Sequence, residues 1–300
     1  MNKPVDIKLR DAVLRGSPAL LHEMMRSFTT LARTLNLSQA VEQLGSTRQT
    51  VRRHINQLEE AMQVRLFDVQ QRRYTLTPEG TRAVAPAQML LDQGEVWFRG
   101  AFDSVGGMLR FSHDDPRGWK YHQQEQPMSS VWTCRSKLLR TALQAWSRSE
   151  GHLESPELAV VRPYILAYRE IADGWICTEV GEASYYSNWF GWAQARSSVG
   201  RRLSQFQGGQ EFASLANGPF QAIKNNHGVR MDQVFMKMQM AEGEPFHHLV
   251  FDRLLMGVRM PDESPAIISV VDAACKIRIL DLDEAILDDV PERSRVDFTL

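Results

Sequence analysis

Hydrophobic residues recur at helical spacing near the start of the chain. Ser17 and Pro18 predict the N-cap and the first position of a first helix, whose apolar stripe runs from Leu20 to Leu35. A short second helix is expected to be capped by Ser38 and to end at Gly45. Two helices joined by a turn that contains glycine are typical of a helix-turn-helix motif.

The segment after this turn, GSTRQTVRRHINQLEEAMQVRLF, predicts a third helix with two different faces. Ser46 and Gln49 have the spacing of a capping box at its start. One face is apolar, and the other carries long hydrogen-bond donors concentrated toward the N-terminal end. The apolar face consists of Val51, Ile55, Leu58 and Met62, and the polar face of Arg48, Gln49, Arg52, Arg53 and Asn56.

A basic hairpin and a long helix are expected next. Residues 64–68 and 73–77 predict two short strands around a polar tip. Thr77 and Pro78 start a helix that should reach about Phe98. Its apolar face exceeds what one small domain can cover, which favours pairing of two copies of the chain. The residues of that face are Val84, Met89, Leu91, Val96 and Trp97.

Three helices followed by a hairpin predict a winged helix-turn-helix, a DNA-binding module. Its third helix enters the major groove by the N-terminal end, so Arg48, Gln49 and Arg52 are expected to reach base edges. Thr47 and Arg53 are expected to hold phosphates, and the hairpin arginines are expected to follow the DNA backbone or the minor groove. The predicted DNA-binding residues are Ser38, Thr47, Arg48, Gln49, Arg52, Arg53, Arg72 and Arg73.

Residues 28–80 resemble the DNA-binding domain of LysR-type transcriptional regulators without any gap. The resemblance implies a winged helix-turn-helix, double-stranded DNA as partner, and a linker helix that pairs two subunits. Arg52, Gln49 and Val69 stand where the family usually has serine, proline and arginine, so the operator preference does not carry over. The matching residues are Phe28, Ala32, Ser38, Ala40, Val41, Leu44, Ile55, Leu58, Glu59, Val64, Arg65, Leu66, Phe67, Leu76, Thr77 and Gly80.

Charge and composition agree with an anionic partner for the first part of the chain only. Residues 1–82 contain 13 Lys and Arg against 8 Asp and Glu, although the whole chain has a net charge of −1. No apolar run approaches the roughly 20 residues that span a bilayer, and residues 1–16 lack the apolar core of a secretory signal. The widely separated Cys134, Cys177 and Cys275 suggest reduced, packed thiols. We therefore expect a cytoplasmic protein with no membrane partner.

The chain beyond the long helix starts with a polar stretch. Residues 112–127, SHDDPRGWKYHQQEQP, predict a long loop, and residues 131–149 predict a helix. The helix carries a heptad stripe that suits either an internal core or a dimer seam. The stripe consists of Trp132, Leu139 and Trp146.

The following residues predict a mixed domain that ends in antiparallel strands. A capped helix is expected from Ser155, then a strand over 175–180 and short helices. This order resembles a PAS domain, as do Val180, Gly181, Asn188, Phe190, Gly191, Gly200 and the turn MPDESP. A PAS-like sheet can hold a small ligand, haem or flavin, or can dimerise, so the cofactor remains open. The short helices are expected at 211–215 and 219–225 and the final strands at 230–240, 246–260 and 266–273.

An aromatic stretch and a methionine-rich strand can supply the walls of a ligand pocket, although plain core packing is the alternative. The chain contains no H-E-x-x-H, G-x-S-x-G, G-x-G-x-x-G, phosphate-loop or C-x-x-C motif. His247 and His248 are neighbours on a predicted strand and should point to opposite faces, which disfavours a shared metal. We therefore expect no enzyme. The predicted pocket residues are Tyr186, Trp189, Phe190, Met236 and Met238.

Together these patterns predict a multidomain α+β protein that regulates transcription as a dimer or higher homo-oligomer, with a possible small-molecule effector. One alternative is a PAS-type sensor or interaction protein whose helix-turn-helix binds DNA without specificity. Another is an enzyme with an accessory DNA-binding domain. The expected domains are a winged helix-turn-helix (1–82), a linker helix (83–105), a loop and helical connector (106–155), a PAS-like domain (156–280) and an acidic C-terminal segment (281–300).

Overall fold

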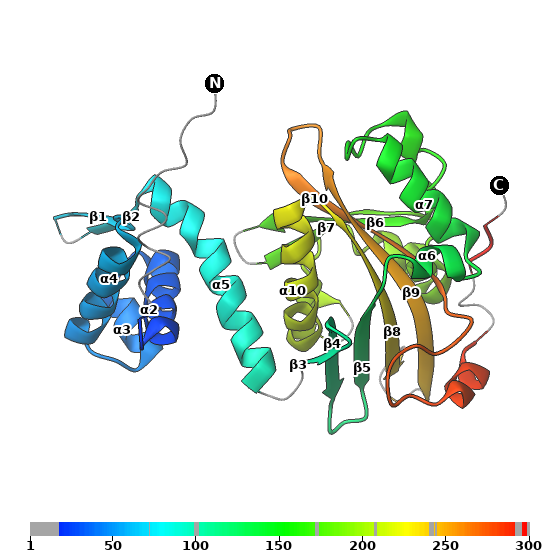
Figure 1. Ribbon diagram of the computed structural model, residues 1–300, viewed down its shortest axis with the longest axis horizontal. Helices are drawn as coiled ribbons and strands as arrows, with labels where there is room; N and C mark the ends of the chain where they lie inside the picture. Colours follow the sequence, from blue (N-terminus) through cyan, green and yellow to red (C-terminus); the bar gives the residue numbers. More distant parts are fainter. Residues whose placement is uncertain are drawn as a thin grey trace. The chain divides into compact units, whose positions relative to one another are not determined.

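A computed structural model describes residues 18–71, 73–98, 102–171, 174–206, 209–239, 243, 245–291 and 296–298. They form two compact units that divide between Glu95 and Val96. The first unit is helical with one hairpin, and the second is built on an eight-stranded antiparallel sheet (Figure 1). This arrangement confirms the predicted multidomain α+β fold.

The first unit contains three short helices, a hairpin that we call the wing, and a long helix. The inward faces of the helices share one core, in which Phe28, Leu31 and Val51 are almost completely buried. The apolar stripes seen in the sequence are the buried faces, which is how amphipathic helices gain most of their stability. The elements are α2 (Leu21–Thr34), α3 (Leu37–Leu44), α4 (Arg48–Met62), the wing strands β1 (Phe67–Gln70) and β2 (Arg73–Leu76), and α5 (Pro78–Phe98).

The caps of α3 and α4 differ from those predicted. Asn36, and not Ser38, caps α3, because its side chain accepts hydrogen bonds from two backbone N–H groups of the first turn. Thr47 caps α4 in the same way, so the expected capping box of Ser46 and Gln49 is wrong. Asn36 and Thr47 both have extended backbone, the conformation that lets a side-chain oxygen reach those N–H groups.

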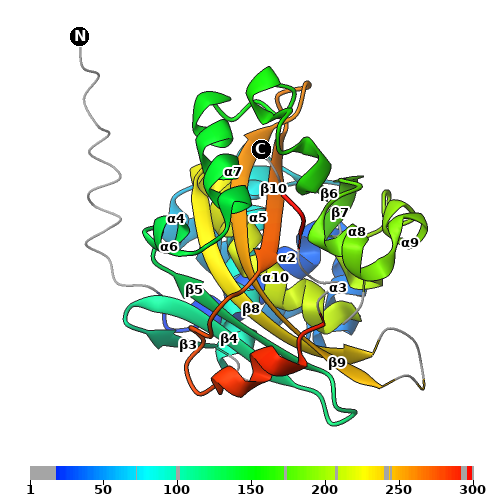
Figure 2. The same ribbon diagram turned by 90° about the vertical axis from the view of Figure 1, so that its right-hand side faces the viewer.

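The second unit is organised by one sheet with the strand order β3-β4-β5-β8-β9-β10-β6-β7. Every neighbouring pair is antiparallel, and β8, β9 and β10 form its long central part (Figure 2). The strands are β3 (Phe102–Val105), β4 (Met108–Asp114), β5 (Lys120–Gln126), β6 (Ile165–Ile171), β7 (Gly174–Val180), β8 (Val229–Gln239), β9 (Phe246–Arg259) and β10 (Pro265–Ala273).

Both faces of this sheet are covered. On one face lie α10 (Gly209–Asn226), α8 (Tyr185–Phe190), α9 (Trp192–Arg196) and the 3-10 turn η3 (Leu203–Gln205). The opposite face packs against α6 (Ser130–Thr133), α7 (Lys137–Arg148) and three 3-10 turns, which are η1 (Pro156–Leu158), η2 (Arg162–Tyr164) and η4 (Glu284–Asp289). Alternate strand residues therefore enter two separate cores, which explains the long apolar runs of β9 and β10.

Several expectations for the second unit are wrong. Residues 106–155 are not a connector, because the supposed loop 112–127 contains most of β4 and all of β5, which pairs with β8. The helix expected after Ser155 is replaced by two 3-10 turns and β6, since Pro163 removes a backbone donor and interrupts a longer helix. The two short helices expected before β8 are one helix, α10, with Pro219 inside it.

The order of elements after residue 156 is otherwise the one expected. Two strands, β6 and β7, stand where the sequence suggested one, and short helices and three antiparallel strands follow. The acidic C-terminal segment contributes η4, whose Ile286 and Leu287 pack against Phe235 and Val250 of the sheet. It is therefore partly a core element of the second unit.

Candidate functional sites

The N-terminal half of α4 presents four predicted DNA-contacting side chains to solvent. Arg48, Gln49, Arg52 and Arg53 are exposed, whereas Val51 between them is fully buried. Residues four apart share one row of a helix, so Arg48 lies in line with Arg52, and Gln49 with Arg53. The first turn contains no acidic residue. Guanidinium groups and the positive end of the helix dipole therefore act together on any anion at this end.

Ser38 and Thr47 stand beside this row but have positioning contacts of their own. The Arg48 Nη2 group donates a hydrogen bond to the Ser38 hydroxyl across 2.8 Å, which ties the start of α3 to the start of α4. Thr47 caps α4, and its hydroxyl lies 2.9 Å from that of Thr50. Both residues are exposed, so a DNA backbone can approach them. The sequence predicted their place but not these contacts.

The wing lies next to the outward face of α4. Arg52 lines the same hollow as Val69 and Tyr74 of the wing strands. Arg73 opens β2 and is exposed, while the predicted contact residue Arg72 lies outside the described residues. The exposed face of α4 thus borders the wing strands, and one of them carries the exposed Arg73.

A buried carboxylate fixes the wing to α4. Glu59 Oε1 accepts hydrogen bonds from the backbone N–H groups of Leu66 and Phe67, at 2.7 and 3.1 Å. Its other oxygen accepts one from Arg65 Nη1 at 3.1 Å, and the Glu59 side chain is only 8% exposed. The Glu59 of the family pattern therefore positions the wing and is not a DNA contact.

Two further close contacts hold the first unit together. The hydroxyl of Ser27 on α2 lies 2.8 Å from Nδ1 of His54 on α4, and both side chains are buried. At Gly80 a Cβ atom would lie 2.1 Å from the carbonyl oxygen of Leu66, so α5 can begin this close to the wing only with glycine there. Neither contact could be located from sequence spacing alone.

The second candidate site is a cavity of about 120 Å³ between the sheet and the helix α8, which covers part of one sheet face. All five predicted pocket residues line it: Tyr186, Trp189 and Phe190 on α8, and Met236 and Met238 on β8. Its walls are overwhelmingly apolar and aromatic, as in many small-molecule sites. Ligand binding by these residues stays a prediction. Lining residues that the sequence analysis missed include Tyr121, Tyr168, Phe206, Phe212, Arg253 and Ser269.

Burial governs the ionisation of the pocket tyrosines. It raises the pKa of Tyr121 and of Tyr186, and raises the pKa of Tyr168 well above its ordinary value. Their hydroxyls therefore stay protonated at neutral pH. Tyr121 donates a hydrogen bond to Gln123 Oε1 at 2.6 Å, and the Tyr186 hydroxyl lies 3.0 Å from that of Ser198.

A buried ionic group borders the cavity. Asp232 is completely buried, and its two carboxylate oxygens lie 2.8 Å from Arg230 Nε and 3.1 Å from Arg253 Nη2. Burial alone would raise the pKa of Asp232, but Arg230 and Arg253 outweigh that effect and lower it. The sequence signal was the charged pair Asp252 and Arg253 inside the apolar run of β9.

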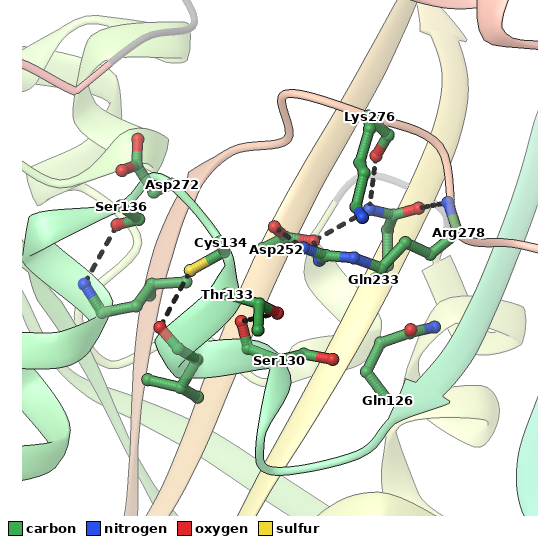
Figure 3. A network of polar contacts seen from close by, with 12 residues as sticks. Gln126, Ser130, Thr133, Cys134, Ser136, Gln233, Asp252, Asp272, Lys276 and Arg278 are labelled. Carbon is green, nitrogen blue, oxygen red and sulfur yellow. Dashed lines mark hydrogen bonds and ion pairs between the residues drawn. The ribbon is translucent and has the colours of Figure 1, made fainter.

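A separate polar network lies on the opposite face of the sheet (Figure 3). Gln233 Nε2 donates hydrogen bonds to Asp252 Oδ1 at 2.9 Å and to the carbonyl oxygen of Lys276 at 3.0 Å. Arg278 Nη1 lies 3.1 Å from the other Asp252 oxygen, although burial raises the pKa of Asp252. The network fastens the segment after β10 to the centre of the sheet.

The packed thiols expected from the sequence are found at Cys134 and Cys177 but not at Cys275, which is exposed. All three cysteines are free, and burial raises the pKa of Cys134 and raises that of Cys177 to about 12, so both thiols stay protonated. His247 lies beside Trp189, while His248 contacts Asp289 at 3.2 Å on the other face, as expected for strand neighbours. Among the described residues no three His, Cys, Asp or Glu side chains gather as a metal site.

The described part of the chain also contains no helix that is both long and apolar enough to cross a membrane.

Residues 22–81 match a family model described as bacterial regulatory helix-turn-helix protein, lysR family. The first unit therefore contains a LysR-family helix-turn-helix domain, as the resemblance implied. That family is one of regulatory proteins and not of enzymes. No curated protein sequence matches the chain.

Similar solved structures are regulators of the same family. Full-length OxyR from Pseudomonas aeruginosa is 27% identical, over 29% of this chain and 28% of that one, with a TM-score of 0.27. The BenM DNA-binding domain in complex with benA site 1 DNA is 23% identical, over 26% of this chain and 92% of that one, with a TM-score of 0.25. CbnR, a LysR family transcriptional regulator, is 22% identical, over 26% and 28%, with a TM-score of 0.25. The chain thus spans little more than a quarter of the full-length regulators that it matches.

Proposed function

We propose that this protein is a sequence-specific transcriptional regulator that binds double-stranded DNA as a dimer and whose second unit binds a small-molecule effector. The observation that carries the proposal is the outward face of α4. Its exposed Arg48, Gln49 and Arg52 are held at the start of a helix within a LysR-family domain. These side-chain types form bidentate hydrogen bonds with guanine and adenine edges in the major groove.

The effector role rests on the aromatic cavity of the second unit. DNA binding and the cavity belong to different units, so a ligand can change operator affinity only by binding two states of the protein unequally. By linkage, operator DNA must then change ligand affinity by the same factor.

Removing an arginine from α4 should reduce discrimination between DNA sequences. For Arg52→Ala and Arg48→Ala we expect the ratio of affinities for a selected operator and a random duplex to fall by about 5- to 150-fold, since one base-reading contact is worth about 1–3 kcal/mol. The measurement is a binding titration of both duplexes at one salt concentration, with the operator selected from a random library.

Two controls sharpen this test. Arg26→Ala removes an exposed arginine of α2 that pairs with Glu23, and should leave the ratio unchanged. Ser38→Ala removes the tether of Arg48 but keeps its guanidinium group. An equal loss of affinity for all duplexes in Arg48→Ala and Arg52→Ala would instead favour a helix-turn-helix that binds DNA without specificity.

Dimerisation should depend on the far end of α5. Leu90, Trp97 and Phe98 are exposed by 49%, 67% and 84%, although they are large and apolar. Sedimentation of the native protein at micromolar concentration should show a dimer, and Trp97→Glu with Phe98→Glu should weaken it roughly tenfold or more. A paired molecule should need two half-sites about 34–36 Å apart.

Arg82→Ala, an exposed polar change on the same helix, should leave the dimer intact. A native monomer with full affinity for one half-site would contradict the dimeric part of the proposal.

A further inference from the structure

The cavity of the second unit has the size of one ring. It measures about 120 Å³, whereas an apolar cavity of about 150 Å³ in another protein holds a single benzene molecule and a water needs only about 10–15 Å³. Haem and flavin, which have several fused or linked rings, exceed this space. The ligand that fits is therefore a compound with one ring and few further atoms.

The walls suit an aromatic ring. Tyr186 and Phe190 lie 4.6 Å apart between ring centroids, Tyr186 and Phe206 lie 5.7 Å apart, and Tyr185 stands 5.2 Å from Phe251. All five residues line the cavity. Aromatic rings attract one another in tilted and edge-to-face arrangements at these separations, and a ligand ring can join such a cluster.

One side of the cavity carries an incompletely satisfied positive group. Arg253 lines the cavity and its side chain is only 7% exposed, yet among the described residues its Nε–H has no hydrogen-bond partner. Its one buried counter-charge, Asp232, is shared with Arg230. Glu125, which lies 3.3 Å from Arg230, is 31% exposed.

An unpaired buried donor is costly, and Arg253 shares its only ion-pair carboxylate among the described residues with Arg230. A ligand oxygen that accepts a hydrogen bond from the Arg253 guanidinium group removes that cost. A carboxylate does so best, because charge-assisted hydrogen bonds between guanidinium and carboxylate are stronger than neutral ones.

We infer that the effector is a single-ring aromatic acid, with its ring among the aromatic walls and its carboxylate against Arg253. This inference rests on the proposed function, of which it names the ligand class. Ser269, which is buried at the cavity wall, is a further neutral hydrogen-bonding group for a ring substituent.

Calorimetric titration of the full-length protein without DNA tests the ligand class with four probes. Benzoate has the ring and the charge, benzyl alcohol the ring alone, butyrate the charge alone, and 2-naphthoate a second ring. We expect benzoate to bind at least about tenfold more tightly than each of the other three, as a charge-assisted hydrogen bond and a filled ring site require. Equal binding of benzoate and benzyl alcohol would overturn the role of Arg253, and equal binding of 2-naphthoate would overturn the single-ring limit.

Two variants test whether benzoate binds in this cavity. Arg253→Gln should lower benzoate affinity about tenfold or more, to that of benzyl alcohol, and should leave benzyl alcohol binding unchanged. Val271→Phe fills the cavity from the strand position paired with Arg253, keeps all charged residues, and should abolish binding of both compounds. Tryptophan fluorescence checks that each variant is folded. Unchanged benzoate affinity in folded Val271→Phe would put the ligand elsewhere and overturn the inference.

The inference and the proposed function fail in different ways. If benzoate binds as expected but leaves operator affinity unchanged, the ligand class stands and the effector role is wrong. If benzoate does not bind although the α4 variants lose operator specificity, DNA recognition stands and the ligand class is wrong.

Discussion

Replacing Asp232 with asparagine should lower the free energy of unfolding of the second unit by about 3–5 kcal/mol. The change leaves the buried guanidinium groups of Arg230 and Arg253 without the carboxylate that lies 2.8 and 3.1 Å from them, and breaking a buried ion pair on one side costs this much. The free energy of unfolding of a typical domain is only about 5–15 kcal/mol in total. Urea unfolding followed by tryptophan fluorescence measures the loss, because every tryptophan in the sequence lies beyond Glu95.

Glu263→Gln is the matched control. Glu263 also pairs with an arginine, Arg259 at 3.3 Å, but its side chain is 65% exposed. Exposed ion pairs contribute little, so we expect a change below about 1 kcal/mol. If both variants lost a similarly small amount of unfolding free energy, the charge of Asp232 would not be needed to stabilise the buried arginines.

The Asp232 effect should also depend on pH. Although burial acts to raise its pKa, the two arginines hold the folded pKa of Asp232 below the ordinary value of 3.8. A group with a lowered folded pKa stabilises the protein above its unfolded pKa and loses that contribution as the pH falls through the folded value. The stability difference between the native protein and Asp232→Asn should thus be constant near neutrality and shrink below about pH 3.8.

Replacing Glu59 with alanine should lower the free energy of unfolding of the first unit by about 2–5 kcal/mol. The change leaves the buried N–H groups of Leu66 and Phe67 without an acceptor, and each such group costs about 1–3 kcal/mol. Hydrogen exchange of the wing amides measures the effect locally. DNA affinity should fall as well, because the wing is no longer fixed beside α4.

Two further variants test whether the loss of stability comes from the lost hydrogen-bond acceptor at Glu59. Glu59→Gln keeps an oxygen that can accept from both N–H groups and should lose less than half as much stability. Glu60→Ala changes the next, exposed residue of α4 and should have an effect below about 0.5 kcal/mol. If Glu59→Ala were as mild as Glu60→Ala, the wing would be held by its apolar contacts alone.

The first unit was largely predictable because each of its helices has one buried face. Phe28, Val51 and Ile55 are apolar at helical spacing and all lie in the core. The caps were missed because hydroxyl and amide residues stand next to each other at both helix starts, and only backbone conformation decides between Ser46 and Thr47. Side-chain identity does not contain that information.

The second unit was less predictable because polar residues are buried in it. β5 reads KYHQQEQ and was expected to be a loop, yet Gln123 and Gln124 are buried on opposite faces of the sheet. Gln123 accepts from Tyr121, and Gln124 accepts from the backbone N–H of Leu280, which lies 156 residues further along the chain. Polar strands of this kind are stabilised by partners that periodicity cannot reveal. The pocket walls were found because aromatic residues and methionines are conspicuous in sequence. The place of Arg253 at the cavity was not found, because its ion-pair partner comes from another strand, β8.

The strand order of the second unit sets when its sheet can form during synthesis. β3 to β5 and the β6–β7 hairpin leave the ribosome first, but they occupy opposite ends of the sheet. They are joined only by β8, β9 and β10, with Leu166 paired to Ser269. Until the last of these strands emerges, the nascent chain contains two short antiparallel pieces with open edges. The helices and wing strands of the first unit have by then all been synthesised. The emerging polypeptide therefore completes its DNA-binding module well before its sheet, and the open edges are the part of the chain most prone to wrong pairing in that interval.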